Sequence, residues 1–432
     1  MKSTLKNFIL LPTLITSLGL IAAGRVTAQT FTNLHCFTTF ALNPSGDYTN
    51  SDGATPQAGL ILSGNTLYGT ANQGGSSGNG TVFAVNINGT GFTNLHTFTA
   101  NSGSHYYTNS DGGFPYAGLI LSGNTLYGTA EASGSSGQGT IFKVNTDGSG
   151  FTTLHSFTAR SFGGPNNDGA NPEAGLILSD NMLYGTAGGG GSSGEGVVFA
   201  VNTNGMGFTN LYSFTGGNDG AGPRAGLTLS GNMLYGTASA GGSSGNGTVF
   251  AVNTNGTGFT NLYSFTGGND GGSPQAGLIL SGNMLYGTAT YSGSSGNGTV
   301  FAVNTNGAGF TTLYSFTGSN DGAWPVAGLI LAGNTLYGTT EIGGSSGRGS
   351  VFSLSLGSVG SYSGPQLVII PYAANLILMW PTNVAGFTLQ STTNLILPTV
   401  WLTVSPGPIV IGGQNTVFTP LAGKQQFFRL SQ

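Results

Sequence analysis

The tetrapeptide LYGT recurs along this chain, and it constrains the fold more than any other feature. Its tyrosine stands at six positions, with successive spacings of 59, 57, 51, 51 and 51 residues. These positions are Tyr68, Tyr127, Tyr184, Tyr235, Tyr286 and Tyr337. A period of roughly 50 residues is typical of solenoids, propellers and other tandem arrays. The chain therefore builds one supersecondary unit again and again.

Each repeat contains four strand-like runs separated by Asn, Gly and Ser. In the fifth repeat these runs are residues 276–280, 284–289, 298–304 and 310–317. The chain has 79 Gly in 432 residues, but its periodic apolar content of 38% favours an ordered all-β fold over a low-complexity segment. Continuous apolar runs such as residues 277–280 indicate strands covered on both faces. Four strands per unit predict a propeller blade rather than a β-helix coil. We interpret the glycine of LYGT as a spacing requirement between blades.

The two ends of the repeat region predict how the array closes. The region begins with FTNLHCFT at residues 31–38, a run of the fourth type, and finishes with SVFSLS at residues 350–355, a run of the third type. If residues 31–38 complete the last blade as its outer strand, no sheet edge stays unpaired. We therefore predict a six-bladed β-propeller over residues 31–357, with four-stranded blades and closure by the N-terminal strand.

The repeated AGLILSGNTLYGT followed by GSSGNGTVFAVN resembles the Gloeo/Verruco (GloVer) tandem repeat of exported proteins of verrucomicrobial and cyanobacterial type. The resemblance covers about residues 31–357 and includes six matching copies. It implies a propeller-like repeat protein of envelope or extracellular location. It implies no defined activity and no catalytic residue.

Residues 1–28 are expected to be a secretory signal peptide. Lys2 and Lys6 precede an apolar stretch at residues 8–23, and residues 26–28 offer a cleavage site. An uncleaved membrane anchor is the alternative, but the stretch is short for a spanning helix. No later segment is expected to span a bilayer. The signal predicts an extracellular, cell-surface or periplasmic protein.

The composition changes after a Gly/Ser linker at residues 357–364. Short apolar runs in residues 365–432 predict a small β-sandwich. This part resembles fibronectin-III-like C-terminal modules through Trp380, the run GFTLQSTTNL, Trp401 and the final FFRL. We expect both tryptophans to be core residues.

The charge balance argues against nucleic acid as a partner. Without the signal peptide, six basic residues remain against thirteen acidic ones. A duplex-binding surface needs clustered Lys and Arg. Cys36 is the only cysteine, so no intramolecular disulfide can form. The sequence indicates no cofactor and does not fix the oligomeric state.

An aspartate heads every copy of the motif DGxxPxAGL. These residues are Asp52, Asp111, Asp168, Asp219, Asp270 and Asp321. A ring of carboxylates could hold a cation at a channel mouth. We favour an Asx-type turn, in which the aspartate accepts from nearby backbone N–H groups and the following glycine takes a positive φ. No metal site is expected.

Three histidines look like candidate bases, namely His35, His96 and His155. When the repeats are aligned, they fall at the position of Tyr212, Tyr263 and Tyr314. We therefore expect them to serve in packing.

All length variation lies between the fourth strand of one repeat and the first strand of the next. Phe37 to Asp52 is 15 positions, the next two such intervals are 13 and 11, and the last three are 5. Insertions in repeat proteins gather on one face, often the binding face. These loops and the variable positions of DGxxPxAGL supply the candidate binding residues Tyr48, His105, Tyr106, Tyr107, Phe114, Tyr116, Arg160, Glu173, Arg224 and Trp324.

These features favour an exported binding or adhesion scaffold for a glycan, a cell-surface polymer or a peptide. A propeller-based carbohydrate-active hydrolase or lyase is the first alternative. It needs two carboxylates in unlike environments, and Glu131, Glu173 and Glu341 are the acids that break the repeat pattern on the predicted binding face. A purely structural envelope protein is the second alternative, and a smooth loop face without a pocket would favour it. An enzyme is the less favoured class, and no catalytic residue is assigned.

Overall fold

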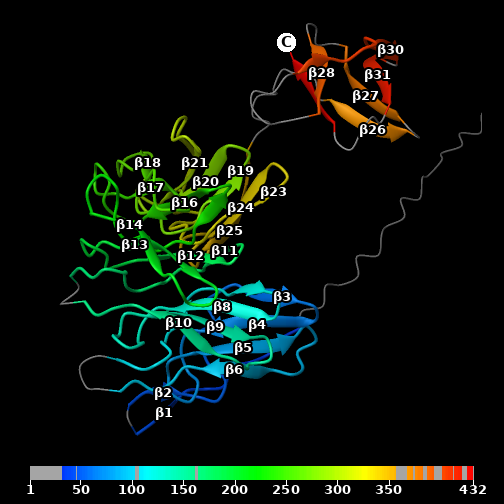
Figure 1. Ribbon diagram of the computed structural model, residues 1–432. Helices are drawn as coiled ribbons and strands as arrows, with labels where there is room; N and C mark the ends of the chain where they lie inside the picture. The colour runs from blue at the N-terminus through cyan, green and yellow to red at the C-terminus, as the bar shows by residue number, and fades with distance from the viewer. Residues whose placement is uncertain are drawn as a thin grey trace, which may run out of the picture.

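The computed structural model describes residues 32–44, 46–102, 107–160, 164–356, 367–372, 375–382, 387–393, 401–411, 413–420 and 426–431. The expected signal peptide and the expected linker lie outside these residues. Every regular element within them is a β-strand (Figure 1), which confirms the prediction of an all-β chain. In this part of the chain, no helix is long and apolar enough to cross a membrane.

Each of the first five LYGT repeats forms a four-stranded antiparallel sheet, and the sixth forms a three-stranded one. We call these six the repeat sheets. The first comprises β3 (Ile61–Ser63), β4 (Thr66–Ala71), β5 (Thr81–Asn86) and β6 (Thr93–Thr97). The second comprises β7 (Ile120–Ser122), β8 (Thr125–Ala130), β9 (Thr140–Asn145) and β10 (Thr152–Ser156). The third comprises β11 (Ile177–Ser179), β12 (Met182–Ala187), β13 (Val197–Asn202) and β14 (Thr209–Ser213).

The later repeat sheets follow the same order of strands. The fourth comprises β15 (Thr228–Ser230), β16 (Met233–Ala238), β17 (Thr248–Asn253) and β18 (Thr260–Ser264). The fifth comprises β19 (Ile279–Ser281), β20 (Met284–Ala289), β21 (Thr299–Asn304) and β22 (Thr311–Ser315). The sixth comprises β23 (Ile330–Ala332), β24 (Thr335–Thr340) and β25 (Ser350–Ser355). A small hairpin of β1 (Ala41–Leu42) and β2 (Tyr48–Thr49) precedes the first repeat sheet.

Neighbouring repeat sheets pack face to face, as the continuous apolar runs predicted. At the junction between the fourth and fifth sheets, Tyr235 and Val249 share a cluster with Leu278, Leu285 and Phe301. Val249, Leu285 and Phe301 have no exposed surface. Corresponding clusters join each repeat sheet to the next along the chain. The hydrophobic core is therefore divided among the junctions between sheets.

The glycine of LYGT serves a different purpose from the one expected. Gly287 on β20 lies directly opposite Phe301 on β21 of the same sheet. A Cβ atom on Gly287 would lie 2.6 Å from Cζ of Phe301 and 2.8 Å from Cδ2 of Leu278. Both contacts lie within one repeat, so the glycine makes room for an aromatic ring on the paired strand. The interpretation as a spacing requirement between blades was wrong.

The closing pair predicted between residues 31–38 and the last repeat is not present among the described residues. β25 has β24 as its one neighbour in the sixth sheet, and residues 32–40 form no strand. Residues 32–38 lie against the first repeat sheet instead, where the His35 ring stacks on Phe92 at 3.6 Å between centroids. The six-bladed closed ring therefore stays a prediction.

The C-terminal residues form two further sheets. One has the order β26 (Val368–Tyr372), β27 (Asn375–Pro381), β31 (Gln414–Pro420), β30 (Ile409–Ile411). The other has the order β29 (Leu402–Thr403), β28 (Thr388–Thr392), β32 (Phe427–Ser431). Leu378, Trp380, Leu389 and Val417 form one buried cluster from strands of both sheets. Trp380 is 1% exposed, as expected of a core residue, whereas Trp401 is only partly buried and lies 4.3 Å from the guanidinium carbon of Arg429. The likeness to fibronectin-III modules stays a prediction.

Candidate functional site

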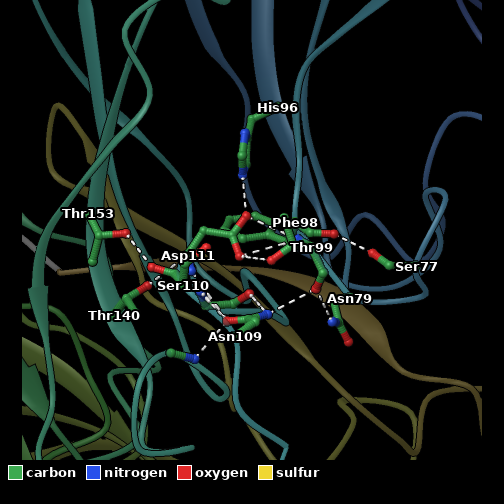
Figure 2. Close-up of polar contacts among 12 residues, drawn as sticks. Ser77, Asn79, His96, Phe98, Thr99, Asn109, Ser110, Asp111, Thr140 and Thr153 are labelled. Atoms are coloured by element: carbon green, nitrogen blue, oxygen red, sulfur yellow. Dashed lines mark hydrogen bonds and ion pairs between the residues drawn. The ribbon is translucent and has the colours of Figure 1, made fainter. Parts of the chain in front are cut away.

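The aspartate of DGxxPxAGL binds the repeat to the one before it. Asp111 accepts hydrogen bonds from the backbone N–H and the hydroxyl of Thr99, which follows β6 of the first repeat sheet (Figure 2). Nε2 of His96 on β6 lies 2.9 Å from Oδ2 of the same carboxylate. In the later repeats a tyrosine replaces the histidine, as with Tyr212 and Asp219 at 2.9 Å. The six aspartates are thus structural, and no group of three or more potential metal ligands occurs among the described residues.

The expected turn is confirmed in part. The glycine after the aspartate has a positive φ in each repeat, for example 95° at Gly112 and 106° at Gly220. At Asp111 and Asp219 the backbone donor to the carboxylate belongs to the threonine that follows the preceding fourth strand. Burial acts to raise the pKa of Asp111, but hydrogen bonds from His96 and Thr99 outweigh it and hold that pKa below its ordinary value.

The three histidines pack as the alignment predicted. The His96 ring stacks on Phe151 at 3.5 Å, and the His155 ring stacks on Phe208 at 3.7 Å. Tyr212 stacks on Phe259 in the same way at 3.6 Å. The hydroxyl of Thr99 donates to Asp111 and not to the imidazole, so this arrangement does not activate a nucleophile.

The three enlarged loops end on a common anchor. Asn109 donates to the carbonyls of Thr99 and Gly112, and its Oδ1 accepts from the N–H groups of Gly112 and Gly134 (Figure 2). Asn50 and Asn166 make the corresponding four hydrogen bonds in the loops before and after. The base of each enlarged loop is therefore held in one conformation, with the inserted residues beyond it.

The position two residues after the DG pair is left-handed in every repeat. It has a φ of 57° at Phe114, 56° at Asn171, 62° at Gly222 and 59° at Trp324. The N–H of Phe114 donates to the carbonyl of Asn79 in the preceding repeat, and its carbonyl accepts from the N–H of Glu131. The left-handed region costs an L-residue roughly 1–2 kcal/mol, and only Gly, Asn and Asp visit it readily. Two bulky aromatic residues thus occupy a strained position that Thr55, Asn171, Gly222 and Ser273 fill in the other repeats.

Three of the predicted binding residues line one cavity of about 290 Å³ between the first two repeats. We call it the aromatic pocket. The residues that line it include Tyr48, Asn79, Asn101, Tyr107 and Phe114. Tyr48 and Tyr107 are 61% and 72% exposed, and both come from enlarged loops. The carboxylate of Asp47 and the amide of Gln73 complete the polar part of the wall.

Two asparagine side chains that line the aromatic pocket are hydrogen-bonded to each other. Nδ2 of Asn79 donates to the carbonyl of Thr99, and its Oδ1 accepts from Nδ2 of Asn101 at 3.1 Å. Oδ1 of Asn101 is buried and has no hydrogen-bond partner among the described residues. A buried acceptor without a donor costs about 1–3 kcal/mol. The aromatic pocket is therefore lined by two hydrogen-bonded amide side chains beside three aromatic rings.

The other charged candidates line a second cavity of about 360 Å³ between the second and fourth repeats. We call it the charged pocket. Its charged lining residues are Glu131, Arg160, Glu173 and Arg224. Nη1 of Arg224 donates to both carboxylate oxygens of Glu173, at 2.9 and 3.1 Å. Arg160 is fixed by hydrogen bonds to Gln138 at 2.7 Å and to Asn171 at 2.9 Å. Four ionisable groups thus meet in a chain that is only 5% charged.

The two carboxylates of the charged pocket have different environments. Burial raises the pKa of Glu131, and the nearby charge of Glu173 raises it further, while Arg224 opposes this only in part. Glu173 has the guanidinium of Arg224 against it as a direct ion pair. One acid is therefore biased towards its neutral form, and the other is paired as a carboxylate.

Two glycines open the charged pocket. Gly188 and Gly189 stand where the second repeat has Glu131 and Ala132 and the fifth has Thr290 and Tyr291. Neither has a positive φ, so the backbone does not require glycine there. A Cβ on Gly188 would lie 3.2 Å from Cγ of Arg224, and a Cβ on Gly189 would collide with Arg160. The missing side chains therefore create the space in which the two arginines lie.

The remaining candidates are placed elsewhere or not at all. Trp324 contacts Tyr291 edge to face at 5.7 Å, away from both pockets. Tyr116 is 46% exposed and lines neither cavity. Glu341 is exposed and does not join Glu131 and Glu173. His105 and Tyr106 lie outside the described residues. Asn79, Asn101 and Gln73 were missed, because amides are common in the turns of every repeat.

These observations define an all-β tandem-repeat protein whose variable residues form pockets along one series of loops. The Gloeobacter/Verrucomicrobia repeat matches residues 104–283 and 216–363, which together span more than half of the chain. The chain belongs to this repeat family. No curated protein matches the chain in sequence.

Several solved structures are similar at low identity. A GH74 enzyme of Niastella koreensis has 14% identity and a TM-score of 0.47, with 89% of this chain and 66% of that chain covered. The GH74 xyloglucanase of Xanthomonas campestris has 12% identity and a TM-score of 0.44, covering 78% and 53% respectively. A chain of a nidogen/laminin complex has 14% identity and a TM-score of 0.38, covering 66% and 92%. The chain thus spans about half the length of the xyloglucanase. At these TM-scores the likenesses carry no argument about its activity.

The hydrogen-bonded carboxylate of Asp111 predicts that the stability of the fold falls at acidic pH. Because the folded pKa of Asp111 lies below its ordinary value of 3.8, the ionised carboxylate stabilises the fold above that pH, and this contribution is lost as the pH falls through the folded pKa. We expect Asp111→Asn to lower the free energy of unfolding by about 1.5–3 kcal/mol at neutral pH, the size of a hydrogen bond to a charged group. Urea unfolding should show this difference shrink as the pH falls below 3.8. Asp180→Asn, in an exposed turn, should change stability by less than about 0.5 kcal/mol. A pH-independent loss at Asp111 would contradict the assignment.

Proposed function

We propose that this protein is an exported binding scaffold whose aromatic pocket takes a neutral carbohydrate. The observation that carries the proposal is the joining of Tyr48, Tyr107 and Phe114 with three amide side chains in one cavity. Aromatic faces bind the apolar face of a sugar ring, and amides bind its hydroxyl groups. The predicted signal peptide supports a location where such polymers occur.

The strained backbone at Phe114 supports a functional role for that side chain. Gly222 and Asn171 show that the turn is compatible with residues that carry no strain at this φ. Thr55 and Ser273 adopt the same φ with small side chains, so what distinguishes the second repeat is an aromatic ring at this position that lines the aromatic pocket.

The polar groups of the aromatic pocket favour a sugar over a charged polymer. Among the described residues, the ionisable groups that line it are Asp47 and the two tyrosines, without an arginine or a lysine. An anionic glycan would lack a counter-charge there. A peptide remains the other class of ligand, and a screen of neutral oligosaccharides separates the two. A purely structural protein would be favoured by a smooth loop face. The two pockets in the loops therefore support a binding protein over a purely structural one.

We expect Phe114→Asn to weaken carbohydrate binding without unfolding the protein. Asn occupies the same left-handed position in the third repeat, so stability should stay within about 1 kcal/mol of wild type. Loss of a buried aromatic contact should weaken binding by about ten- to a hundredfold. A neutral glycan array followed by calorimetry on the strongest ligand measures this.

Trp324→Asn is the matched control for that experiment. It also replaces an aromatic residue by Asn at the same left-handed position, in the sixth repeat, and Trp324 does not line the aromatic pocket. It should leave binding unchanged. The proposal is wrong if no neutral oligosaccharide is retained, or if Phe114→Asn binds as tightly as wild type.

A second candidate function rests on the charged pocket. Glu131 and Glu173 share this cavity, one with a raised pKa and the other paired with Arg224. Two acids in unlike environments are what glycoside hydrolysis needs: a neutral acid to protonate the leaving oxygen and a carboxylate on the other side of the bond. We infer that Glu131 would be the acid and Glu173 the carboxylate if the protein hydrolyses a glycan.

Glu131→Gln should lower the release of reducing ends from a cleaved polysaccharide by about a hundred- to ten-thousandfold, the usual contribution of a general acid. Glu341→Gln is the control, because Glu341 holds the same repeat position but lies outside the charged pocket. A panel of soluble polysaccharides with a reducing-end assay gives the measurement. If wild type releases none, or if Glu131→Gln and Glu341→Gln behave alike, the protein is not a hydrolase of this kind.

A further inference from the structure

Within the described residues, the sixth repeat sheet has three strands, whereas each of the other five has a fourth. In the fifth sheet, β21 pairs with both β20 and β22, and Val300 on β21 has no exposed surface. In the sixth sheet, β25 pairs with β24, and Val351 at the position of Val300 is 83% exposed. An open strand edge with apolar side chains is a template for pairing with another strand.

A groove of about 330 Å³ lies along β25 where the missing strand would run. Val300, Tyr314 and Phe316 of the fifth repeat form one wall, and Val351, Phe352 and Leu354 of the sixth form the other. In the other repeats the corresponding space is filled by the fourth strand of the sheet. The shape of the groove is therefore that of a strand already known from the same chain.

Tyr314 lacks the ring that its counterparts stack on. Tyr212 stacks on Phe259 at 3.6 Å, and Tyr263 stacks on Phe310 at 3.5 Å. In each case the phenylalanine comes just before the fourth strand of the next sheet. Within the described residues Tyr314 is 38% exposed and stacks on no such phenylalanine. The sixth sheet is therefore missing a phenylalanine as well as a strand.

The chain holds one spare copy of this strand, at residues 32–38. Its sequence TNLHCFT matches TTLYSFT of β22 and the residues after it, and Phe31 precedes it as Phe310 precedes β22. Residues 32–38 already lie on the first repeat sheet as a fourth strand lies on the next sheet. A Cβ on Gly89 would lie 3.0 Å from the carbonyl oxygen of Leu34, just as one on Gly307 would lie 2.9 Å from that of Leu262. In the other sheets the fourth strand pairs with the third strand of its own sheet, as β22 does with β21. Residues 32–38 have no such partner strand among the described residues.

The two ends of the repeat stack expose the two halves of one interface. Leu60 of the first repeat is 53% exposed, whereas its equivalent Leu278 is 5% exposed. Ile330 and Tyr337 of the sixth repeat are 67% and 39% exposed. The five junctions inside the chain show how such faces fit together. In this structure one copy leaves both halves uncovered at once, although its residues 32–38 are in place on the first sheet. A second copy can cover both halves without any change in the curvature of the repeat stack, and closure within one chain is the competing outcome that the test below separates.

We propose that residues 32–38 of one copy pair with β25 of a second copy, which joins the copies head to tail. The register follows from β21 and β22, where Thr299 pairs with Ser315 and Val300 with Tyr314. By that register Cys36 lies opposite Ser350, and His35 lies opposite Val351. Such a contact joins two different surfaces and generates a ring or an open filament of copies. It is independent of what the two pockets bind.

The lone cysteine gives a direct test. Ser350→Cys places a thiol opposite Cys36, and Val197 at the same position of the third repeat shows that the site requires no hydroxyl. After mild oxidation of the chain from Gln29 onward, a non-reducing gel should show a ladder of disulfide-linked dimers and larger species. Ser353→Cys is the matched control, because its partner by the same register is Thr32, and it should give no ladder. Adding Cys36→Ser to Ser350→Cys should also abolish the ladder.

Light scattering provides the second measurement. Wild type should form species of two or more copies that dissociate on dilution, and Val351→Lys should be a monomer with an unchanged circular dichroism spectrum. The proposal is overturned if Ser350→Cys forms its disulfide within a monomer, which would mean that the chain closes on itself. It is equally overturned if Ser350→Cys forms no disulfide, or if wild type is a monomer at every concentration.

Discussion

The hydrogen bonds received by one carboxylate per repeat hold this structure together. Each aspartate of DGxxPxAGL lies between the end of one fourth strand and the turn that begins the next repeat. A buried carboxylate is costly unless donors surround it. Here a threonine N–H, a threonine hydroxyl and a histidine or tyrosine supply them, for example Thr99 and His96 around Asp111. The turn is thereby fixed relative to both sheets, and the same geometry recurs at every junction.

The pockets follow from that fixed turn. Because the turn and the loop after the second strand are joined by backbone hydrogen bonds across repeats, their variable side chains project from a constant framework. Phe114 lines the aromatic pocket in the second repeat. Asn171 holds the same position in the third repeat, and its Oδ1 accepts a hydrogen bond from Arg160. Gly188 and Gly189 create a cavity by providing no side chain. A family of this kind can therefore change its ligand by substitution at a few rim positions while its core stays the same.

The sequence predicted the repeating sheets, and some of the residues that it singled out, such as Phe114 and Glu173, line cavities in the structure. The repeat period and the number of strands per repeat could be predicted because the spacing of hydrophobic residues is a local property of the sequence. The burial of Trp380 could be predicted from its residue type. The partners of Asp111 were not, since Thr99 and His96 come from a different repeat and a different strand. Glu131 and Glu173 were singled out as exceptions to the repeat, but their shared cavity depends on glycines that look like any other turn glycine. Closure depends on the angle between sheets, which no single repeat encodes.

Amide hydrogen exchange at the rim tests the central claim most directly. The N–H groups of Phe114, Asn171 and Trp324 each donate to a carbonyl of the preceding repeat. If the aspartate turns fix a rigid rim, these three amides exchange as slowly as the amides within β8 and β12, although they lie in loops. Exchange at the rate of an unprotected peptide would contradict a rigid rim and, with it, the preformed pockets.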